Sequence, residues 1–438
     1  MNKESDLGLL FGCPRYSPFR KFIRTVLVLS CIVMSFLLFF ETPMETDATL
    51  DDGAFDLVSG PTNHTFKEYA IVEKDDESYI GNAIHYKTSQ RYTTIGSHDE
   101  ALTKGVCLFT QLSLDRLDTL VELASSWQNY MSVALYIQDS QDSNKLHHSL
   151  ERITTILSKN LSSSARIDIS LLYGYQLSAP QSLKHHPYDL LYPINALRNL
   201  AMRGCQSEYV FSLDVDFITA QNAHTSIISH LERLETARQT DTRLALVVPV
   251  FEWIFPREPM PMPMNLDQLR TYCSRNRLIP FHSKRLDRSR YTPQDLKDWC
   301  NGQTETPKHI KITRVQNLTD YSQWLRADHV YPIQKNPRIL DMYYEPYFIA
   351  RKETMPEFSE RFRGYGFNKR ANAMAMQYAH FRFEVLQHVF AVHRYHPSSS
   401  WKSKLKSEEI IAKTLERTFD AYKRELIRNK KKSPHFKN

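Results

Sequence analysis

Residues 209–216 read Tyr-Val-Phe-Ser-Leu-Asp-Val-Asp, and this stretch is the strongest local signal in the chain. The run from Tyr209 to Leu213 is apolar and contains aromatic and β-branched residues, which is typical of a buried strand. Asp214 and Asp216 follow where the chain leaves that strand. Residues i and i+2 of an extended chain point the same way, so both carboxylates are expected to reach one divalent cation. The alternatives are carboxylates that only cap a turn, or a phosphatase nucleophile, which needs a later acidic cluster that the sequence lacks.

Further apolar runs lie on both sides of this stretch and alternate with amphipathic segments. We expect strands at 106–110, 132–137, 167–171, 209–213 and 244–250. Helices are expected after Ser113, with Leu117, Leu120, Val121 and Ala124 on one face, then from Pro193, and at 224–238. Such alternation predicts an α/β sheet with helices on both faces and ligands beyond the carboxyl ends of the strands. Residues 251–335 are expected to form an irregular insertion, and residues 345–396 to close the domain.

An uncharged apolar segment, TVLVLSCIVMSFLLFF, runs from Thr25 to Phe40. Basic residues precede it and acidic residues follow it, which predicts a transmembrane signal-anchor with the bulk of the chain in the lumen. A cleaved signal peptide is the alternative, but the residues after Phe40 lack a small-x-small cleavage pattern. The expected parts are a cytosolic tail (1–24), the anchor (25–40), a stem (41–102), a catalytic domain (103–415) and a basic C-terminal helix or tail (416–438).

The composition of the 438-residue chain, 42% hydrophobic and 12% aromatic, is that of a folded protein. Its formal net charge of +7 comes mainly from basic residues near the two ends. No zinc spacing or RNA-binding signature accompanies this charge, so no nucleic-acid partner is expected.

Sequons and cysteines fit a lumenal location. The sequons are at Asn63, Asn160 and Asn317. Four cysteines follow the apolar segment, and an oxidising compartment permits disulfides between them. We favour a disulfide between Cys273 and Cys300, which flank a loop-like stretch rich in Pro and Arg. Cys107 and Cys205 lie near predicted strands and are either buried thiols or a second pair.

Longer segments occur in order between Thr110 and His393: TQLSLDRLDTLVELASSW, YPINALRNLA, YVFSLDVDF, ALVVPVFE, YEPYFIARKE, ERFRGYGFNK and FEVLQHVFAVH. Together they resemble glycosyltransferase family 49, to which β-1,4-glucuronyltransferases and the second catalytic domain of LARGE-type xylosyl-glucuronyltransferases belong. The resemblance implies a GT-A fold with a mixed, mostly parallel sheet, an inverting reaction, a UDP-sugar donor and Mn²⁺ or Mg²⁺.

The resemblance also implies roles for residues that match its motifs. The implied metal ligands are Asp214, Asp216 and His393. The implied donor-binding residues are Thr110, Gln111, Asn195, Arg198, Asp214, Asn368 and Lys369. Of these, Thr110 and Gln111 would lie beside the uridine at the end of the first strand, and Asn195 and Arg198 share one helical face. Without the resemblance, His393 would be taken as a core histidine.

Glu360 is the candidate general base, because an inverting transfer needs a group that takes the proton of the acceptor hydroxyl. The alternative is a surface carboxylate paired with Arg361 or Arg363. The chain also departs from the family here, since it reads FSERF where a second acidic residue is expected. Tyr365 is a candidate to stack its ring on a sugar. Glu252 and Glu345 are candidates to bind sugar hydroxyl groups, and the alternative for both is a purely structural carboxylate.

These expectations describe a single-pass enzyme of the Golgi or endoplasmic reticulum membrane. Its expected reaction is transfer of glucuronic acid from UDP-glucuronate to a terminal sugar of a glycoprotein glycan, such as xylose on an O-mannosyl glycan. The alternatives are N-acetylglucosamine transfer from its UDP donor, or a silent lumenal partner in a complex with another glycosyltransferase.

Overall fold

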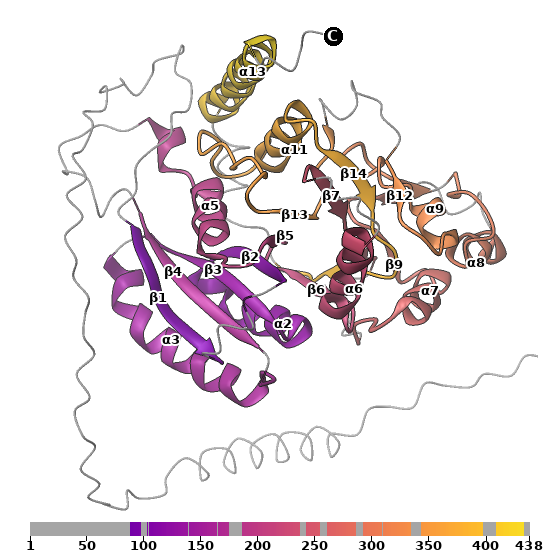
Figure 1. Ribbon diagram of the computed structural model, residues 1–438, viewed down its shortest axis with the longest axis horizontal. Coiled ribbons are helices and arrows are strands. Elements are labelled where there is room, and N and C mark those ends of the chain that lie inside the picture. The colour runs from indigo at the N-terminus through magenta and orange to yellow at the C-terminus, as the bar shows by residue number, and fades with distance from the viewer. Residues whose placement is uncertain are drawn as a thin grey trace, which may run out of the picture. The chain divides into compact units, whose positions relative to one another are not determined.

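The computed structural model describes residues 88–97, 103, 105–138, 140–163, 165–174, 186–236, 242–254, 261–285, 292–308, 310–333, 343–396 and 409–432 (Figure 1). All of them belong to one compact unit, Tyr69–Asn438. The predicted cytosolic tail and anchor, most of the predicted stem and the sequon at Asn63 lie outside the described residues. Among the helices described, none is long and apolar enough to span a membrane.

The elements alternate along the chain as the sequence predicts. The first ten are β1 (Thr88–Gly96), β2 (Val106–Ser113), η2 (Leu114–Arg116), α2 (Leu117–Trp127), β3 (Tyr130–Ile137), α3 (Ser140–Asn160), β4 (Arg166–Tyr173), η3 (Pro187–Leu190), α5 (Ile194–Gly204) and β5 (Tyr209–Ser212). The next are β6 (Phe217–Thr219), α6 (Ala223–Thr236), β7 (Leu244–Val247), β8 (Val250–Trp253), α7 (Leu266–Ser274), β9 (Leu278–Pro280), β10 (Lys284–Arg285) and α8 (Pro293–Cys300). The last are β11 (Ile310–Lys311), α9 (Tyr321–Arg326), β12 (Tyr331–Pro332), β13 (Phe348–Arg351), α11 (Asn368–Tyr378), β14 (Arg382–Val385), β15 (Ala391–His393) and α13 (Glu409–Lys432).

Nine of the described strands form one mixed sheet, in the order β1-β4-β3-β2-β5-β13-β7-β14-β12. The neighbours β4, β3, β2 and β5 run parallel, as do β7 and β14. The pairs β1–β4, β5–β13, β13–β7 and β14–β12 are antiparallel. A mixed sheet is therefore confirmed, and the strands β4, β3, β2, β5, β7 and β14 all run in one direction. The exceptions are β13, which enters antiparallel between β5 and β7, and the two edge strands, which run against their neighbours.

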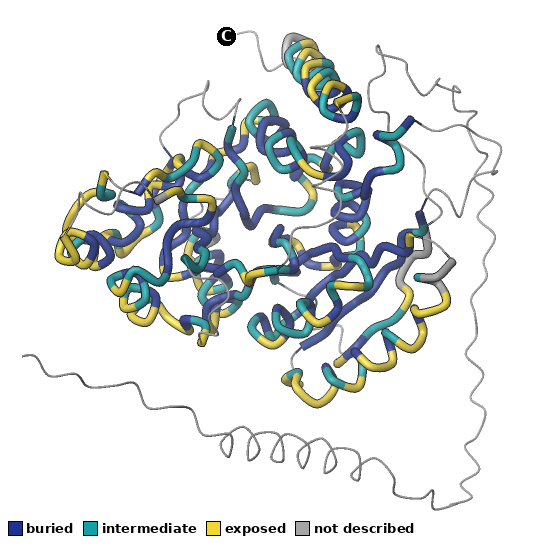
Figure 2. The backbone as a smooth tube through the Cα atoms, turned by 180° about the vertical axis from the view of Figure 1, so that it is seen from behind, coloured by how far each residue is buried: buried dark blue, intermediate teal, exposed yellow. Residues whose placement is uncertain are grey.

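Helices cover both faces of this sheet, as predicted. On one face α5 packs against β2, β3 and β4, and Leu197 joins a cluster that includes Phe109. On the other face lie α2, α3 and α6, and Leu120 joins a cluster that includes Leu108. Leu108 and Phe109 belong to different clusters because successive strand residues point to opposite faces. Figure 2 shows the central strands buried, whereas α3 exposes one side.

A second, four-stranded sheet has the order β6-β15-β8-β9. The prediction of a single strand at 244–250 is wrong. Two strands replace it, β7 in the large sheet and β8 in the small one. The chain changes sheet at Val248 and Pro249. Proline has no N–H to donate to a ladder, so a strand cannot continue through it in a sheet interior. The path from β5 to β6, through Asp214–Asp216, makes the same change.

The expected irregular insertion at 251–335 is also wrong where the structure describes it, because it contains three short helices. Asn265 caps α7, Thr292 and Asp295 form a capping box on α8, and Asp320 caps α9. Helices of six to nine residues have too few turns to produce a clear periodic pattern.

The four cysteines that follow the apolar segment form two disulfides. Cys273–Cys300 joins α7 to the end of α8 and confirms the predicted pair. Cys107–Cys205 joins β2 to the residue that follows α5, so these two are not free thiols. Asn160 ends α3 with an exposed side chain, and the side chain of Asn317 is exposed as well.

The two ends of the described unit extend beyond the predicted boundaries of the catalytic domain. β1 lies in the segment expected to be stem, and it pairs with β4 along most of its length. α13 runs across the expected boundary at residue 415. Its residues Ile411, Leu415 and Phe419 pack with Phe362 and Met374 in a third hydrophobic cluster. Although its composition is basic, the helix therefore packs against the domain through an apolar face.

Candidate active site

The Asp214–Asp216 triplet forms a turn between the two sheets. The backbone N–H of Phe217 donates to the carbonyl of Asp214 at 3.3 Å, which closes the turn. In a turn, residues i and i+2 no longer share a direction as they do in a strand. That both carboxylates reach one cation stays a prediction, and in the described part of the chain the two side chains have separate sets of hydrogen-bond partners.

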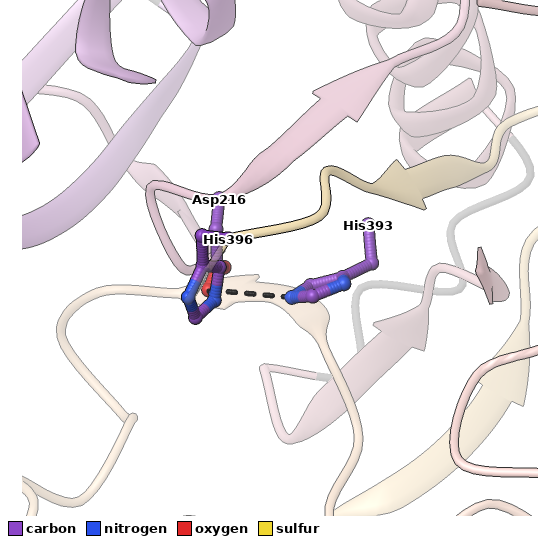
Figure 3. A group of neighbouring side chains, drawn as sticks. All are labelled: Asp216, His393 and His396. Atoms are coloured by element: carbon purple, nitrogen blue, oxygen red, sulfur yellow. Dashed lines mark hydrogen bonds and ion pairs between the residues drawn. The ribbon is translucent and has the colours of Figure 1, made fainter. Parts of the chain in front are cut away.

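Asp216 lies in a cluster with two imidazoles, His393 and His396 (Figure 3). Its Oδ2 is 3.4 Å from Nε2 of His393 and 2.7 Å from Nε2 of His396. The pairing of β6 with β15 sets this geometry, because Phe217 is the register partner of His393 and the N–H of Arg394 donates to the Asp216 carbonyl. The predicted association of Asp216 with His393 is therefore a consequence of sheet register.

This cluster has the composition of a transition-metal site. One potential ligand atom from each of Asp216, His393 and His396 lies within 4.8 Å of the others. The Oδ1 atom of Asp216 is buried and has no hydrogen-bond partner in the described part of the chain. Burial alone would raise the pKa of the Asp216 carboxyl, but hydrogen bonds from the two histidines hold it below its usual value. One carboxylate with two imidazoles can bind a divalent first-row transition metal, a class that includes Mn²⁺, so the residues fit the metal that the resemblance implies.

Asp214 is engaged by cationic and phenolic groups instead. Its Oδ1 accepts from Arg198 at 2.7 Å, and its Oδ2 accepts from Tyr347 at 2.8 Å and Lys369 at 3.0 Å. Burial would raise the pKa of the Asp214 carboxyl, but Lys369 and Arg198 hold it below its usual range. Asp214 thus positions the side chains of Arg198 and Lys369. In the described part of the chain it is not a member of the group formed by Asp216 and the two histidines.

α5 connects this ion cluster to the 358–360 segment. Arg198 also donates to Asn195 and Asn368, both at 3.2 Å, while Asn195 donates to the carbonyl of Ser359 at 2.9 Å. The predicted nucleotide-side residues of α5 and α11 are therefore in mutual contact. The side chains of Asn195, Arg198 and Asn368, all from the predicted donor-binding set, are buried.

Glu360 is held by α5. Asn199 donates to its carboxylate at 2.9 Å, and the guanidinium of Arg203 is 3.8 Å away. Glu360 does not pair with Arg361 or Arg363, the two alternative partners, because Arg361 pairs with Glu425 and Arg363 with Asp189. The side chain of Glu360 is 22% exposed, so a base role stays a prediction that the geometry permits.

Glu252 is the register partner of His393 across β8 and β15, which puts it on the same face of the small sheet. Burial raises the pKa of its carboxyl to about 7, although hydrogen bonds from the backbone at His282 and Ser283 oppose the shift. Burial also raises the pKa of the Glu345 carboxyl, against the effect of nearby cationic side chains. Glu252 thus lies near the Asp216 cluster, and Glu345 lies near the charged groups around Asp214.

Thr110 and Gln111 lie inside β2 and not at its end, because the strand continues to Ser113. Both are buried, and Gln111 accepts a hydrogen bond from Tyr192. Thr110 has a buried hydroxyl with no partner among the described residues. Their predicted position beside the uridine stays a prediction.

Three site residues were missed in the sequence: His396, Tyr347 and Asn199. His396 follows His393 by three residues in HRYHP, and a second histidine at that spacing was a usable signal. Tyr347 and Asn199 carried no such signal, since their roles depend on partners far away in the chain.

Comparison with known proteins shows the family to which the chain belongs. Residues 105–429 match the family model described as "Glycosyl-transferase for dystroglycan", glycosyltransferase family 49. The match includes the described strands β2–β15 and nearly all of α13, and the chain belongs to that family.

Two relatives illustrate the similarity. The glycosyltransferase-like protein gnt14 of Dictyostelium discoideum is 28% identical over 68% of this chain, and the mouse xylosyl- and glucuronyltransferase LARGE2 is 29% identical over 74%. The matched segments cover 38% and 39% of those proteins, so the chain spans about two fifths of their length. Solved structures are less similar: Staphylococcus aureus TarS 1–349 in complex with UDP is 11% identical over 72% of each chain, with a TM-score of 0.29.

Proposed function

We propose that this chain is an inverting, metal-dependent glycosyltransferase that transfers glucuronic acid from UDP-glucuronate to a terminal sugar of a glycoprotein glycan. The family membership and the activity for which mouse LARGE2 is named support the reaction class and the donor. The single observation that carries the mechanism is the Asp216–His393–His396 cluster with its unpartnered buried carboxylate oxygen. Xylose on an O-mannosyl glycan is the proposed acceptor.

In this proposal Asp216, His393 and His396 hold Mn²⁺ or Mg²⁺, which when bound would neutralise charge on the departing diphosphate. Arg198 on α5 and Lys369 on α11 would add positive charge beside the same diphosphate. Asp214 keeps these two cationic side chains in place. Glu360 is the proposed base for the acceptor hydroxyl, held in one rotamer by Asn199.

We also propose that the protein is anchored in the Golgi or endoplasmic reticulum membrane with this domain in the lumen. The apolar segment 25–40 and its flanking charges support this location. The two disulfides favour an oxidising compartment. Protease protection of the domain in sealed microsomes is the expected result, and digestion without detergent would reject the lumenal assignment.

A donor panel tests the reaction. The purified full-length chain is incubated with UDP-glucuronate, UDP-N-acetylglucosamine or UDP-xylose, with Mn²⁺ or with chelator, and UDP release is measured with and without a xylose-terminated acceptor. We expect release from UDP-glucuronate that requires Mn²⁺ and increases with acceptor. Turnover of UDP-N-acetylglucosamine alone would replace the donor assignment, and no metal-dependent turnover of any donor would favour a silent partner.

The variant Asp216→Asn should lower UDP release at least about 100-fold while Mn²⁺ affinity falls, because it removes the only carboxylate of the cluster. The matched control is Asp267→Asn, which changes an exposed aspartate on α7. If Asp216→Asn keeps wild-type activity, the metal assignment is wrong.

A further inference from the structure

A pocket of about 300 Å³ lies between α11, α13 and the segments 343–345 and 365–367. This volume is at the lower end of the range for small-molecule sites. The residues that matter for its chemistry are Tyr343, Glu345, Tyr365, Arg370, Ala412 and Glu416.

The pocket adjoins the Asp214 site through two shared chain segments. On α11, Lys369 donates to Asp214 and the next residue, Arg370, lines the pocket. Before β13, Tyr347 donates to Asp214 and Glu345 lines the pocket two residues earlier. The charges of Lys369 and Asp214 act directly on the Glu345 carboxyl. A ligand in this pocket is therefore beside the groups proposed to bind the donor.

The pocket surface is mostly apolar and aromatic, and a few polar groups of both kinds stand among its lining residues. The side chain of Tyr365 is 45% exposed, which is unusual for a large ring. The guanidinium of Arg370 lies 4.8 Å from the ring centre of Tyr343, and its Nε is buried without a hydrogen-bond partner in the described structure. Glu345 and Glu416 supply carboxylates. An aromatic ring for C–H groups, with donors and acceptors around it, is the chemistry that holds a polyhydroxylated ring.

We infer that this pocket is the subsite for an uncharged sugar ring, namely the terminal ring of the acceptor glycan. The inference rests on the proposed function and adds the position and charge of its acceptor. The surface that lines the pocket is mostly apolar, and burial of a carboxylate against apolar surface costs more free energy than burial of neutral hydroxyl groups. The glucuronate ring of the donor is thereby disfavoured in the pocket, and the neutral partner of the reaction remains.

The inference gives α13 a role in substrate binding. Ala412 and Glu416 of this helix form one wall of the pocket. The helix approaches the 365–367 segment closely, since a Cβ on Gly366 would lie 2.9 Å from Cδ2 of Leu415, and Gly366 has a φ of +111°. The basic C-terminal helix is thus a part of the acceptor site and not a solvated tail.

Saturation-transfer NMR on the purified full-length chain with Mn²⁺ tests the inference, because uridine and glycoside signals are read in one sample. The probes are UDP, methyl β-xyloside, methyl β-glucoside and methyl β-glucuronide. We expect saturation of one or both neutral glycosides and little of the glucuronide. The variant Ala412→Leu, which fills the pocket, should weaken neutral glycoside binding about tenfold, and Tyr365→Ala between about twofold and tenfold. UDP signals should persist in both.

Controls are chosen from matched positions. Lys413→Leu changes the neighbouring, exposed residue of α13, and Tyr92→Ala removes a ring of similar exposure on β1. Both should bind glycosides as the wild type does. Equal saturation by glucoside and glucuronide, or neutral glycoside binding unchanged in both pocket variants, overturns the inference. Glycoside binding that follows the expected pattern without any UDP signal would instead reject the proposed function and leave the pocket standing as a sugar site.

Discussion

At the scale of single residues, the two aspartates of one Asp-x-Asp triplet have different surroundings. Asp216 lies with two histidines, and Asp214 lies with Arg198, Lys369 and a tyrosine. After the turn at 214–216, Asp214 meets side chains from α5, from α11 and from the segment before β13, whereas Asp216 meets histidines at the end of β15 and just after it. Substitution of the two should therefore have different consequences.

His396→Ala tests whether the residue absent from the sequence-based ligand set belongs to the cluster. Loss of one of three ligands should weaken Mn²⁺ binding by about 10- to 100-fold or more, with the fold intact. Isothermal titration of Mn²⁺ into the full-length chain measures this. His329→Ala is the control, because that side chain is exposed away from the cluster. Equal Mn²⁺ affinity in the two variants would remove His396 from the site.

Asp214→Asn should affect stability more than metal binding. The side chain of Arg198 is only 3% exposed, and loss of its carboxylate partner leaves a buried charge poorly compensated. We expect a decrease in the free energy of unfolding of about 3 kcal/mol, measured by urea denaturation. The control Glu357→Gln breaks an exposed pair with Arg203 and should cost under about 1 kcal/mol. Similar losses for the two variants would contradict the prediction.

The effect of Asp214→Asn should depend on pH. Its carboxyl has a pKa below the usual value in the folded protein, because Lys369 and Arg198 outweigh burial. Such a group stabilises the fold above its unfolded pKa, about 3.9, and that contribution is lost as pH falls through the lower folded value. The difference between wild type and variant should be full at neutral pH and shrink below about pH 4. A difference that grows on acidification would show that the sign is wrong.

At the scale of elements, α13 is the clearest difference between composition and packing. Basic residues predominate in its C-terminal half, yet Leu415 in its N-terminal half is buried against the third hydrophobic cluster. We expect Leu415→Ala to lower the free energy of unfolding by about 2–5 kcal/mol, because a buried leucine leaves a cavity. Asp420→Ala, at an exposed position of the same helix, should change it by less than about 0.5 kcal/mol. Urea denaturation compares them, and a small effect of Leu415→Ala would mean that α13 is only loosely attached.

The short helices α7, α8 and α9 show the limit of periodicity. Their capping residues are legible in the sequence, but each helix is too short for an apolar stripe to stand out. The helices α2, α5 and α6 and the parallel strands β2, β3 and β4 were predicted from the repeat of their apolar residues, whereas the long helix α3 was not.

At the scale of the whole molecule, two disulfides connect segments that are distant in sequence. Cys107–Cys205 closes a separation of 98 residues and links β2 to the end of α5, which carries several site residues. Cys107→Ser with Cys205→Ser should lower the free energy of unfolding by about 2–5 kcal/mol. Thermal denaturation with and without reductant measures this. If reductant destabilises the double variant as much as the wild type, the contribution belongs to the other disulfide.

The sequence by itself determined the class of fold, the strands β2, β3, β4 and β5 of the large sheet, one disulfide and the family. These follow from local apolar patterns and from motifs that lie within short stretches. Only the tertiary structure decided that Asp214 and Asp216 have separate partners, that His396 joins the cluster, and that α13 forms a wall of the pocket. The physical reason is that each of these depends on register and on contacts between segments far apart in the chain. The register of β6 with β15 brings Asp216 to His393, and no local pattern specifies which strands will pair.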